Sequence, residues 1–192
     1  MFLSDIDILA AVKKEEITLV PFDEQRLQPA SYDILLGNKF VVNDEHATHL
    51  VDPARKIFAK TREIEVADEG EFVLHPGVAV LGISKEFFGS NHYLVQVGGK
   101  SSLARVGLMI HNTAGLINPG HFLHITFELC NLNNVPIVLR PGMEIAQLTF
   151  SRLSSPPSNV YNNIARGKDN WESNFKGRDL LSTKKERGKA KK

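Results

Sequence analysis

The sequence predicts an all-β protein with a few short helices, and two features of residues 64–150 indicate this fold class. Short apolar segments in this range are separated by turn-forming clusters such as Asp-Glu-Gly, Pro-Gly and Gly-Ser-Asn. These turns recur at spacings of about 8–12 residues, which is typical of a β-sandwich or a β-barrel. We expect strands over residues 17–20, 31–36, 40–42, 64–67, 72–75, 78–84, 93–97, 121–130, 137–140 and 145–150.

One helix is predicted near the N-terminus, where Ser4 is a suitable N-cap. Ile6, Leu9 and Ala10 follow it with the i, i+3, i+4 spacing of one helix face. We therefore expect a short helix over residues 4–14 that buries these three side chains.

Composition divides the chain into three parts. Residues 1–154 hold the predicted strands and form the expected β domain, and a Ser- and Pro-rich stretch then begins a separate segment, 155–181. Residues 182–192 form a basic tail, and without Thr183–Lys192 the formal net charge falls from +1 to about −4. The tail favours a solvated, disordered end over a specific nucleic-acid contact.

The compartment is indicated by cysteine use and by the N-terminus. Cys130 is the single cysteine, so no internal disulfide can form, and a reducing compartment is favoured. Asp5 and Asp7 do not fit the basic n-region of a signal peptide. No apolar run approaches the about 18 residues that a membrane helix needs. We expect a soluble cytoplasmic protein with no membrane contact.

An anion site is one interpretation of the stretch that follows Gly98 and Gly99. Two hydroxyls and two cations lie within six residues, which suits a polyphosphate (Lys100, Ser101, Ser102 and Arg105). The alternative is a helix N-terminus with a serine cap and with the lysine and arginine in solvent, and the spacing leaves both open. A Walker-type loop is excluded because GxxxxGK[ST] is missing.

Glu128 is the second candidate for chemistry. It lies in the middle of the predicted strand 121–130, on the face shared with Thr126 and opposite the aliphatic face. A carboxylate between apolar neighbours is costly unless it is paired or takes part in a reaction. Glu128 is therefore either a general acid/base or the structural partner of Arg105 or Arg140.

The remaining polar candidates favour structural roles. Asp33, within the strand-like 31–36, more often makes a structural hydrogen bond than a catalytic one. Cys130 has no obvious base and is best explained as a buried structural thiol. The HxE…PCxxC signature of zinc deaminases is absent. No common zinc spacing occurs among the histidines considered, which are His46, His49, His111, His121 and His124.

Five segments resemble the dCTP deaminase branch of the dUTPase-like trimeric nucleotide hydrolases. They are PASYDILLG at 29–37, KSSLARVGL at 100–108, TAGLINPG at 113–120, ITFE at 125–128 and PGMEIAQL at 141–148. The resemblance covers roughly residues 1–180. It implies a distorted β-barrel or jelly roll, a homotrimer with active sites between subunits, and a C-terminal segment that closes over the nucleotide.

The resemblance also implies a hydrolytic deamination of dCTP without zinc. Glu128 would be the general acid/base, and Ser101 and Arg105 would position the attacking water. Lys100, Ser102 and Arg105 would face the triphosphate, whose Mg²⁺ is held mainly by phosphate oxygens. Thr126 and Phe127 would contact the base through their backbone. The other implied nucleotide-binding residues are Leu103, Ala104, Thr113, Ala114, Asn118, Gln147, Tyr161 and Lys168.

Asn118 departs from the family pattern, which usually has Asp there. In dUTPases and in bifunctional deaminases that Asp contacts the sugar 3′-hydroxyl or activates the hydrolytic water, whereas Asn is no base at neutral pH. The run Thr113–Gly115 is nevertheless more like the bifunctional enzymes.

Three hypotheses follow for the function. The leading one is deamination of dCTP to dUTP and ammonia, which feeds thymidylate synthesis. The second is a bifunctional enzyme that forms dUMP and diphosphate, or a plain dUTPase. The third is a non-catalytic nucleotide-binding regulator on the same fold.

Overall fold

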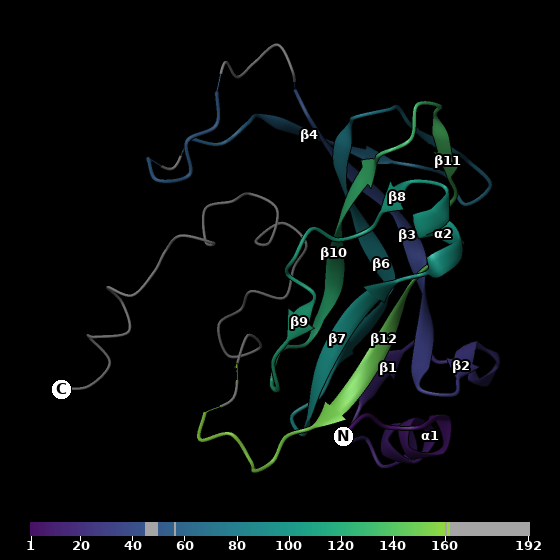
Figure 1. Ribbon diagram of the computed structural model, residues 1–192, viewed down its shortest axis with the longest axis vertical. Helices are drawn as coiled ribbons and strands as arrows, with labels where there is room; N and C mark the ends of the chain where they lie inside the picture. Colours follow the sequence, from purple (N-terminus) through teal and green to yellow (C-terminus); the bar gives the residue numbers. More distant parts are fainter. Residues whose placement is uncertain (45–49, 56, 160, 162–192) are drawn as a thin grey trace.

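The computed structural model describes residues 1–44, 50–55, 57–159 and 161 (Figure 1). The predicted tail 182–192 and most of the predicted segment 155–181 lie outside the described residues. The helices are α1 (Asp5–Lys13), the 3-10 helix η1 (Glu24–Arg26) and α2 (Ser101–Arg105). The strands are β1 (Thr18–Val20), β2 (Leu27–Gln28), β3 (Ser31–Asn43), β4 (Thr61–Glu65), β5 (Phe72–Leu74), β6 (Ala79–Gly89), β7 (Tyr93–Gly99), β8 (Leu108–Met109), β9 (Leu116–Ile117), β10 (Leu123–Asn131), β11 (Ile137–Leu139) and β12 (Glu144–Arg152).

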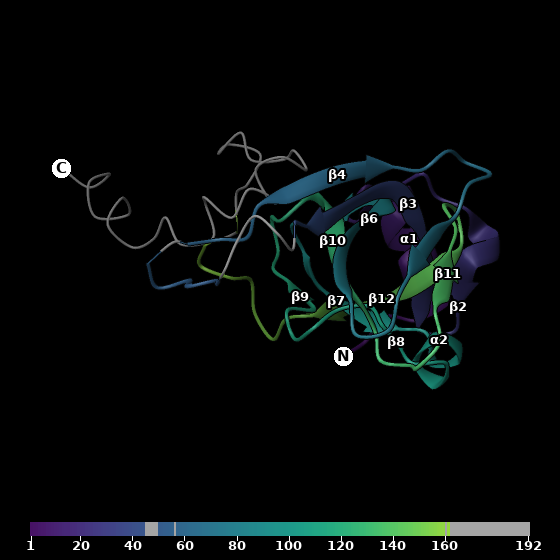
Figure 2. The same cartoon turned by 90° about the horizontal axis from the view of Figure 1, so that it is seen from above.

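Ten of the strands form one antiparallel sheet in which β3 is the hub. The main order is β8-β10-β6-β3-β12-β7-β9, and β1, β2 and β4 pair with β6 or β3 beside this path. Strands β5 and β11 form a separate two-stranded sheet. Seen from above, the sheet curls around an interior as a half-closed barrel (Figure 2). The predicted all-β fold with a barrel-like sheet and a few short helices is confirmed.

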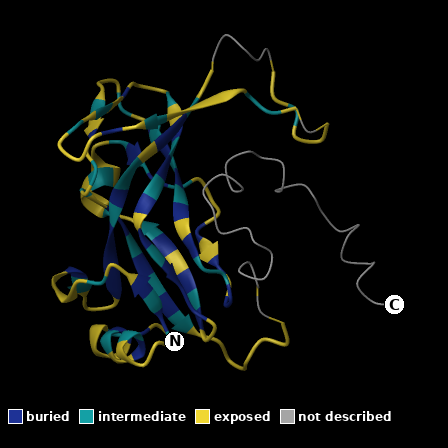
Figure 3. Ribbon diagram, turned by 180° about the vertical axis from the view of Figure 1, so that it is seen from behind, coloured by how far each residue is buried: buried dark blue, intermediate teal, exposed yellow. Residues whose placement is uncertain are grey.

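The core lies inside this curl, where every second residue of the long strands is buried (Figure 3). The rings of Phe40 and Phe72 stack there with centroids 4.3 Å apart. Fully buried aromatic side chains supply much of the apolar area that stabilises the fold. They are Tyr32, Phe40, Phe88, Phe127 and Phe150. No helix in the described ranges is long and apolar enough to cross a membrane.

Helix α1 confirms the predicted helix but not its predicted apolar face. Ser4 and Asp7 form a capping box, in which the Ser4 side chain accepts the Asp7 N–H. The buried residues are Ile8 and Ala11, and Ile6 is exposed. The expected face of Ile6, Leu9 and Ala10 is therefore wrong. The spacing of Ile8 and Ala11 fits a helix equally well, and packing decides between the two faces.

Strand β3 runs without a break through Gly37, where the sequence predicted an interruption between 31–36 and 40–42. A Cβ at Gly37 would lie 2.7 Å from the Ile83 side chain and 3.0 Å from its carbonyl oxygen. Glycine is needed here because strand β6 approaches too closely for any side chain. The pairing of β3 with β6 also shifts register between Leu36 and Phe40, so the sheet bends at this point.

A buried ion pair fastens η1 to β6. Arg26 and Glu86 are joined by a short contact between guanidinium and carboxylate, and the Glu86 side chain is fully buried. The other Glu86 carboxylate oxygen accepts the Leu35 N–H at 2.9 Å. Arg26 also donates to the carbonyl oxygens of Pro21 and Asp33, at 3.2 and 3.3 Å. The pair therefore fixes the segment of β3 that carries Asp33.

The N-terminal residues complete the sheet beside the end of β12. The Leu3 N–H donates to the Phe150 carbonyl oxygen at 2.9 Å, and Phe2 forms a bridge with Ser151. The Arg152 N–H in turn donates to the Met1 carbonyl oxygen at 3.0 Å. These contacts cover an edge of β12 that would otherwise be free to pair with another chain.

Candidate active site

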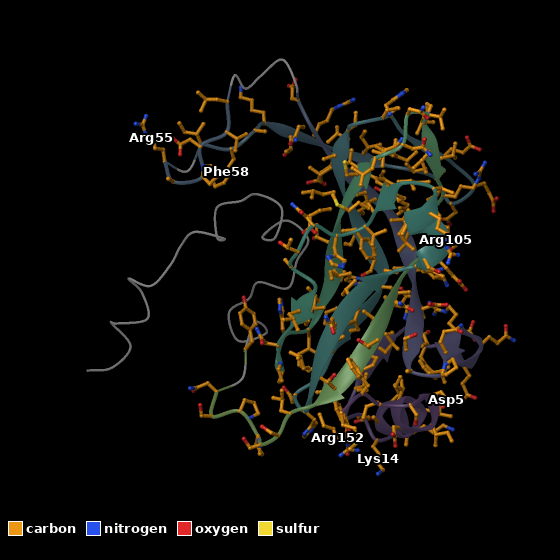
Figure 4. All side chains as sticks on the ribbon, viewed as in Figure 1. Asp5, Lys14, Arg55, Phe58, Arg105 and Arg152 are labelled. Atoms are coloured by element: carbon orange, nitrogen blue, oxygen red, sulfur yellow. The ribbon has the colours of Figure 1, made fainter. Side chains whose placement is uncertain are left out.

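The stretch from Lys100 to Arg105 forms helix α2, directly after β7. Lys100 is the N-cap residue, but no side chain caps the helix, so the predicted serine cap is absent. The helix ends before Gly107, whose φ is +83° and whose added Cβ would lie 2.9 Å from the Asn133 nitrogen. Most of α2 is solvent-exposed, and Arg105 lies on the outer surface of the molecule (Figure 4).

The alternative of a plain helix N-terminus placed Lys100 in solvent, and this expectation is wrong for Lys100. Two carboxylates hold its ammonium group. Its Nζ donates to Asp33 Oδ2 at 2.6 Å and to Glu144 Oε2 at 2.5 Å. The pKa of Lys100 is raised, because its hydrogen bonds to these carboxylates outweigh burial, which alone would lower it. Asp33 also accepts from Gln28 Nε2 at 3.2 Å. The predicted structural role of Asp33 is thus confirmed, and its partner is a predicted site residue.

A cavity of about 290 Å³ opens beside Lys100. It brings together four residues that the sequence predicted for nucleotide binding, namely Lys100, Ser101, Ser102 and Gln147. Gln147 reaches it from β12, where its Oε1 accepts from Ser31 Oγ at 3.3 Å. A larger cavity of about 660 Å³ lies near His124, but none of the predicted substrate residues lines it. The smaller cavity is therefore the better candidate for holding phosphates.

Glu128 lies in the middle of β10, on the same half-exposed face as Thr126 and Cys130, as the alternation predicted. Its Oε2 accepts the backbone N–H of Asn112 at 3.1 Å. Arg140 pairs with Glu71 instead, so the alternative of a Glu128–Arg140 ion pair is wrong. No ion pair of Glu128 with Arg105 occurs within the described residues.

Among the residues that the structure describes, no strand pairs with one edge of β10 next to Glu128. Ile125 donates its N–H to Ser84 Oγ, and Asn131 donates its N–H to the Val78 carbonyl oxygen. The backbone N–H and C=O groups of the odd-numbered residues therefore point towards β6. The backbone groups of the even-numbered residues point to the other edge of β10. In the described part of the chain, β8 pairs with this edge only at residues 130 and 131. Within the described residues, the N–H and C=O groups of Thr126 and Glu128 therefore face an edge without a partner strand, which is where a planar base could pair.

The loop between β8 and β10 carries further predicted residues. Thr113 and Ala114 are exposed and follow Asn112, which holds the Glu128 carboxylate. Asn118 is exposed, and its carbonyl oxygen accepts the His121 N–H at 3.1 Å.

Tyr161 docks on this same turn. Its N–H donates to the Pro119 carbonyl oxygen at 2.7 Å, and its ring lies 4.4 Å from that of His121, measured between centroids. Tyr161 therefore places the start of the C-terminal segment beside the turn that contains Asn118. Lys168 lies outside the described residues.

A sequence profile described as dCTP deaminase-like matches residues 2–153. The chain belongs to this family. A relative named "dCTP deaminase, dUMP-forming" from Tropheryma whipplei (strain Twist) is 49% identical over 162 residues, which are 84% of this chain and 83% of the relative. One of the same name from Mycolicibacterium smegmatis is 46% identical over 169 residues, or 87% of this chain and 89% of the relative.

Among solved structures, 2′-deoxycytidine 5′-triphosphate deaminase from Agrobacterium tumefaciens matches with a TM-score of 0.60. The two are 21% identical, and the match covers 78% of this chain but only 46% of that one. At this identity the likeness supports the fold alone. It agrees with the assignment to the dCTP deaminase-like family.

Sequence reasoning did not assign three of these side chains to the candidate site. Gln28 lines the cavity beside Lys100, Asp33 holds Lys100 there, and Glu144 holds the same ammonium group from β12, the strand paired with β3. The run that contains Asp33 and the run that contains Glu144 both belong to the family resemblance. Membership in these two runs was the only indication in the sequence that Asp33 and Glu144 belong to the site. Their contact with Lys100 could not be predicted, because it depends on the fold.

Proposed function

We propose that this chain is a dCTP deaminase and that it carries the product on to dUMP and diphosphate. The observation that carries the deamination is the Glu128 carboxylate, which is held by Asn112 beside the open backbone edge of Thr126. Relatives that are 42–49% identical and are named "dCTP deaminase, dUMP-forming" support the substrate and the product.

The deamination needs only groups of this chain and the substrate. The Thr126 N–H and C=O would pair with the cytosine edge and hold C4 near Glu128. Glu128 would take a proton from water as the oxygen attacks C4, and would return protons to N3 and to the leaving amino group. One water is consumed, the bond between C4 and the amino nitrogen breaks, and the products are ammonia and a uracil ring. Ser101 and Arg105 would orient the water.

The two halves of the proposed site come from different places on one chain. Helix α2 and the middle of β10 lie on different sides of the molecule, and Glu128 does not line the cavity with Lys100 (Figures 1 and 2). We propose that a homotrimer brings α2 of one subunit to β10 of the next. Lys100 and Ser102 would then bind the triphosphate of a magnesium nucleotide, whose phosphate oxygens hold the ion.

Mixed trimers test this arrangement. Glu128→Gln and Arg105→Met should each be nearly inactive alone. In trimers formed at random from equal amounts of both variants, about one quarter of the sites have both residues intact if the site is shared between neighbours. Co-expressed variants should therefore regain about a quarter of the wild-type activity. Regain of no activity, with trimers present in sedimentation, would place Glu128 and Arg105 in the same subunit's site.

Release of diphosphate from dUTP, the second step, decides whether the final product is dUMP or dUTP. The names of the relatives and the run Thr113–Gly115 favour dUMP. Asn118 favours dUTP, because its amide can bind a sugar hydroxyl but cannot take a proton from water. We infer that dUMP forms slowly enough for some dUTP to be released.

A time course with dCTP and Mg²⁺ tests both steps, with the nucleotides separated by chromatography. Wild-type protein should form dUMP together with free dUTP. Asn118→Asp should lower the released fraction of dUTP, because a carboxylate can activate water for diphosphate release. Asn91→Asp, another exposed asparagine in a turn, is the matched control. Absence of dCTP turnover would contradict the proposed function, and dUTP as the only product would contradict the second step.

A further inference from the structure

The two carboxylates that hold Lys100 differ in how firmly they are fixed. The Asp33 side chain is 5% exposed, lies in the hub strand β3 and also binds Gln28. The Glu144 side chain is 48% exposed and belongs to the first residue of β12, just after a turn. Lys100 itself is 22% exposed. One partner is therefore built into the sheet, and the other can rotate into solvent at little cost.

This arrangement conflicts with phosphate binding. An ammonium group with two carboxylates at 2.5–2.6 Å has little charge left to offer a triphosphate. The carboxylate of Asp33, which lines the cavity, and that of Glu144 beside Lys100 would also repel the phosphate groups. Lys100 therefore has to release one of its two carboxylates when the triphosphate binds. Release of Asp33 would cost more than release of Glu144, because it would leave a buried carboxylate without a partner.

We propose that Glu144 is a displaceable competitor for Lys100, which the triphosphate must replace, while Asp33 keeps the ammonium group in place. This inference rests on the proposed function for the nature of the ligand. Glu144 is then a positioning residue that weakens binding of nucleotides through Lys100. A nucleotide whose phosphates do not contact Lys100 would not meet this competition, so Glu144 should weaken triphosphate binding more than monophosphate binding.

Replacing Glu144 with glutamine tests the exchange. Glu144→Gln should lower the KM for dCTP by about 2- to 5-fold with kcat unchanged, because the lost competitor is one partly exposed ion pair. The KM for dCMP, measured as a poor substrate, should change much less. The matched control is Glu71→Gln, which removes a carboxylate that is 49% exposed and paired with Arg140 away from the cavity. That variant should leave both KM values unchanged.

A double-mutant cycle separates competition for Lys100 from general charge repulsion. In a Lys100→Met background, Glu144→Gln should no longer raise kcat/KM, because the group that Glu144 occupies is gone. An unchanged KM in the single variant, or an equal gain in the Lys100→Met background, would overturn the inference.

Binding of inorganic tripolyphosphate with Mg²⁺, measured by calorimetry, gives a second test that needs no turnover. Glu144→Gln should bind it about 2- to 5-fold more tightly than wild type. A protein that does not turn over dCTP but shows this gain would contradict the proposed function and support the exchange. Equal affinities would overturn the exchange whatever the activity.

Discussion

Replacement of Glu128 by glutamine should lower kcat for dCTP by about 10²–10⁴-fold, the usual contribution of a general acid/base. Glutamine keeps the size of the side chain, and its amide oxygen can still accept the Asn112 N–H that now binds Glu128. It cannot take a proton from water. The rate of ammonia release with saturating dCTP measures the effect.

Two further measurements make the Glu128 result specific. Glu63→Gln, an exposed carboxylate on β4, should keep the wild-type kcat. Calorimetry should show that Glu128→Gln binds dCTP within a few-fold of the wild-type affinity. If Glu128→Gln retained full activity, Glu128 would not be the acid/base. A wild-type protein that binds dCTP and releases no ammonia would instead favour the non-catalytic regulator.

Replacement of Arg26 by methionine should lower the free energy of unfolding by about 3–5 kcal/mol, because it leaves the buried Glu86 carboxylate without its partner. The effect reaches the site, since Arg26 donates to the Asp33 carbonyl oxygen and Glu86 accepts the Leu35 N–H. Urea denaturation at one fixed protein concentration measures it, because assembly makes stability depend on concentration.

Arg140→Met is the matched control for this prediction. It breaks an ion pair between the same residue types, Arg140 and Glu71, but at the surface, where such pairs contribute about 0–1 kcal/mol. The double variant Arg26→Met with Glu86→Leu should recover part of the loss, because no charge then remains buried. If Arg26→Met and Arg140→Met lowered the free energy of unfolding equally, burial of the Glu86 carboxylate would not be the cause of the effect.

Local patterns were sufficient to predict most of the sheet. Alternation over 121–130 and 145–150 predicted β10 and β12 within a few residues, and Ser4 predicted the start of α1. The two-residue strands β2, β8 and β9 were missed, because two residues carry no periodicity. Strand β4 (Thr61–Glu65) begins and ends earlier than the predicted 64–67, and β7 continues through Gly98 and Gly99, beyond the predicted 93–97.

The candidate site was predictable only where its residues are close in sequence or belong to a family run. Lys100, Ser101 and Ser102 are consecutive, and the structure places them on one cavity. The partners of Lys100 come from β3 and β12, and no spacing rule connects such distant segments. Pairing of charges across a sheet depends on register, which is fixed by packing of the whole core.

Closure of the sheet by the first residues has a kinetic consequence. Leu3 bonds to Phe150 and Phe2 bridges Ser151, so the sheet joins segments from the two extremes of the described β domain. Contacts between such remote segments form late, and proteins dominated by them fold in about milliseconds to seconds. During synthesis, α1 and β3 must wait for β12 to leave the ribosome before this edge can close. A nascent chain that stops before β12 leaves β3 and the first residues without this strand partner, and such unpaired strand edges are recognised by chaperones and proteases.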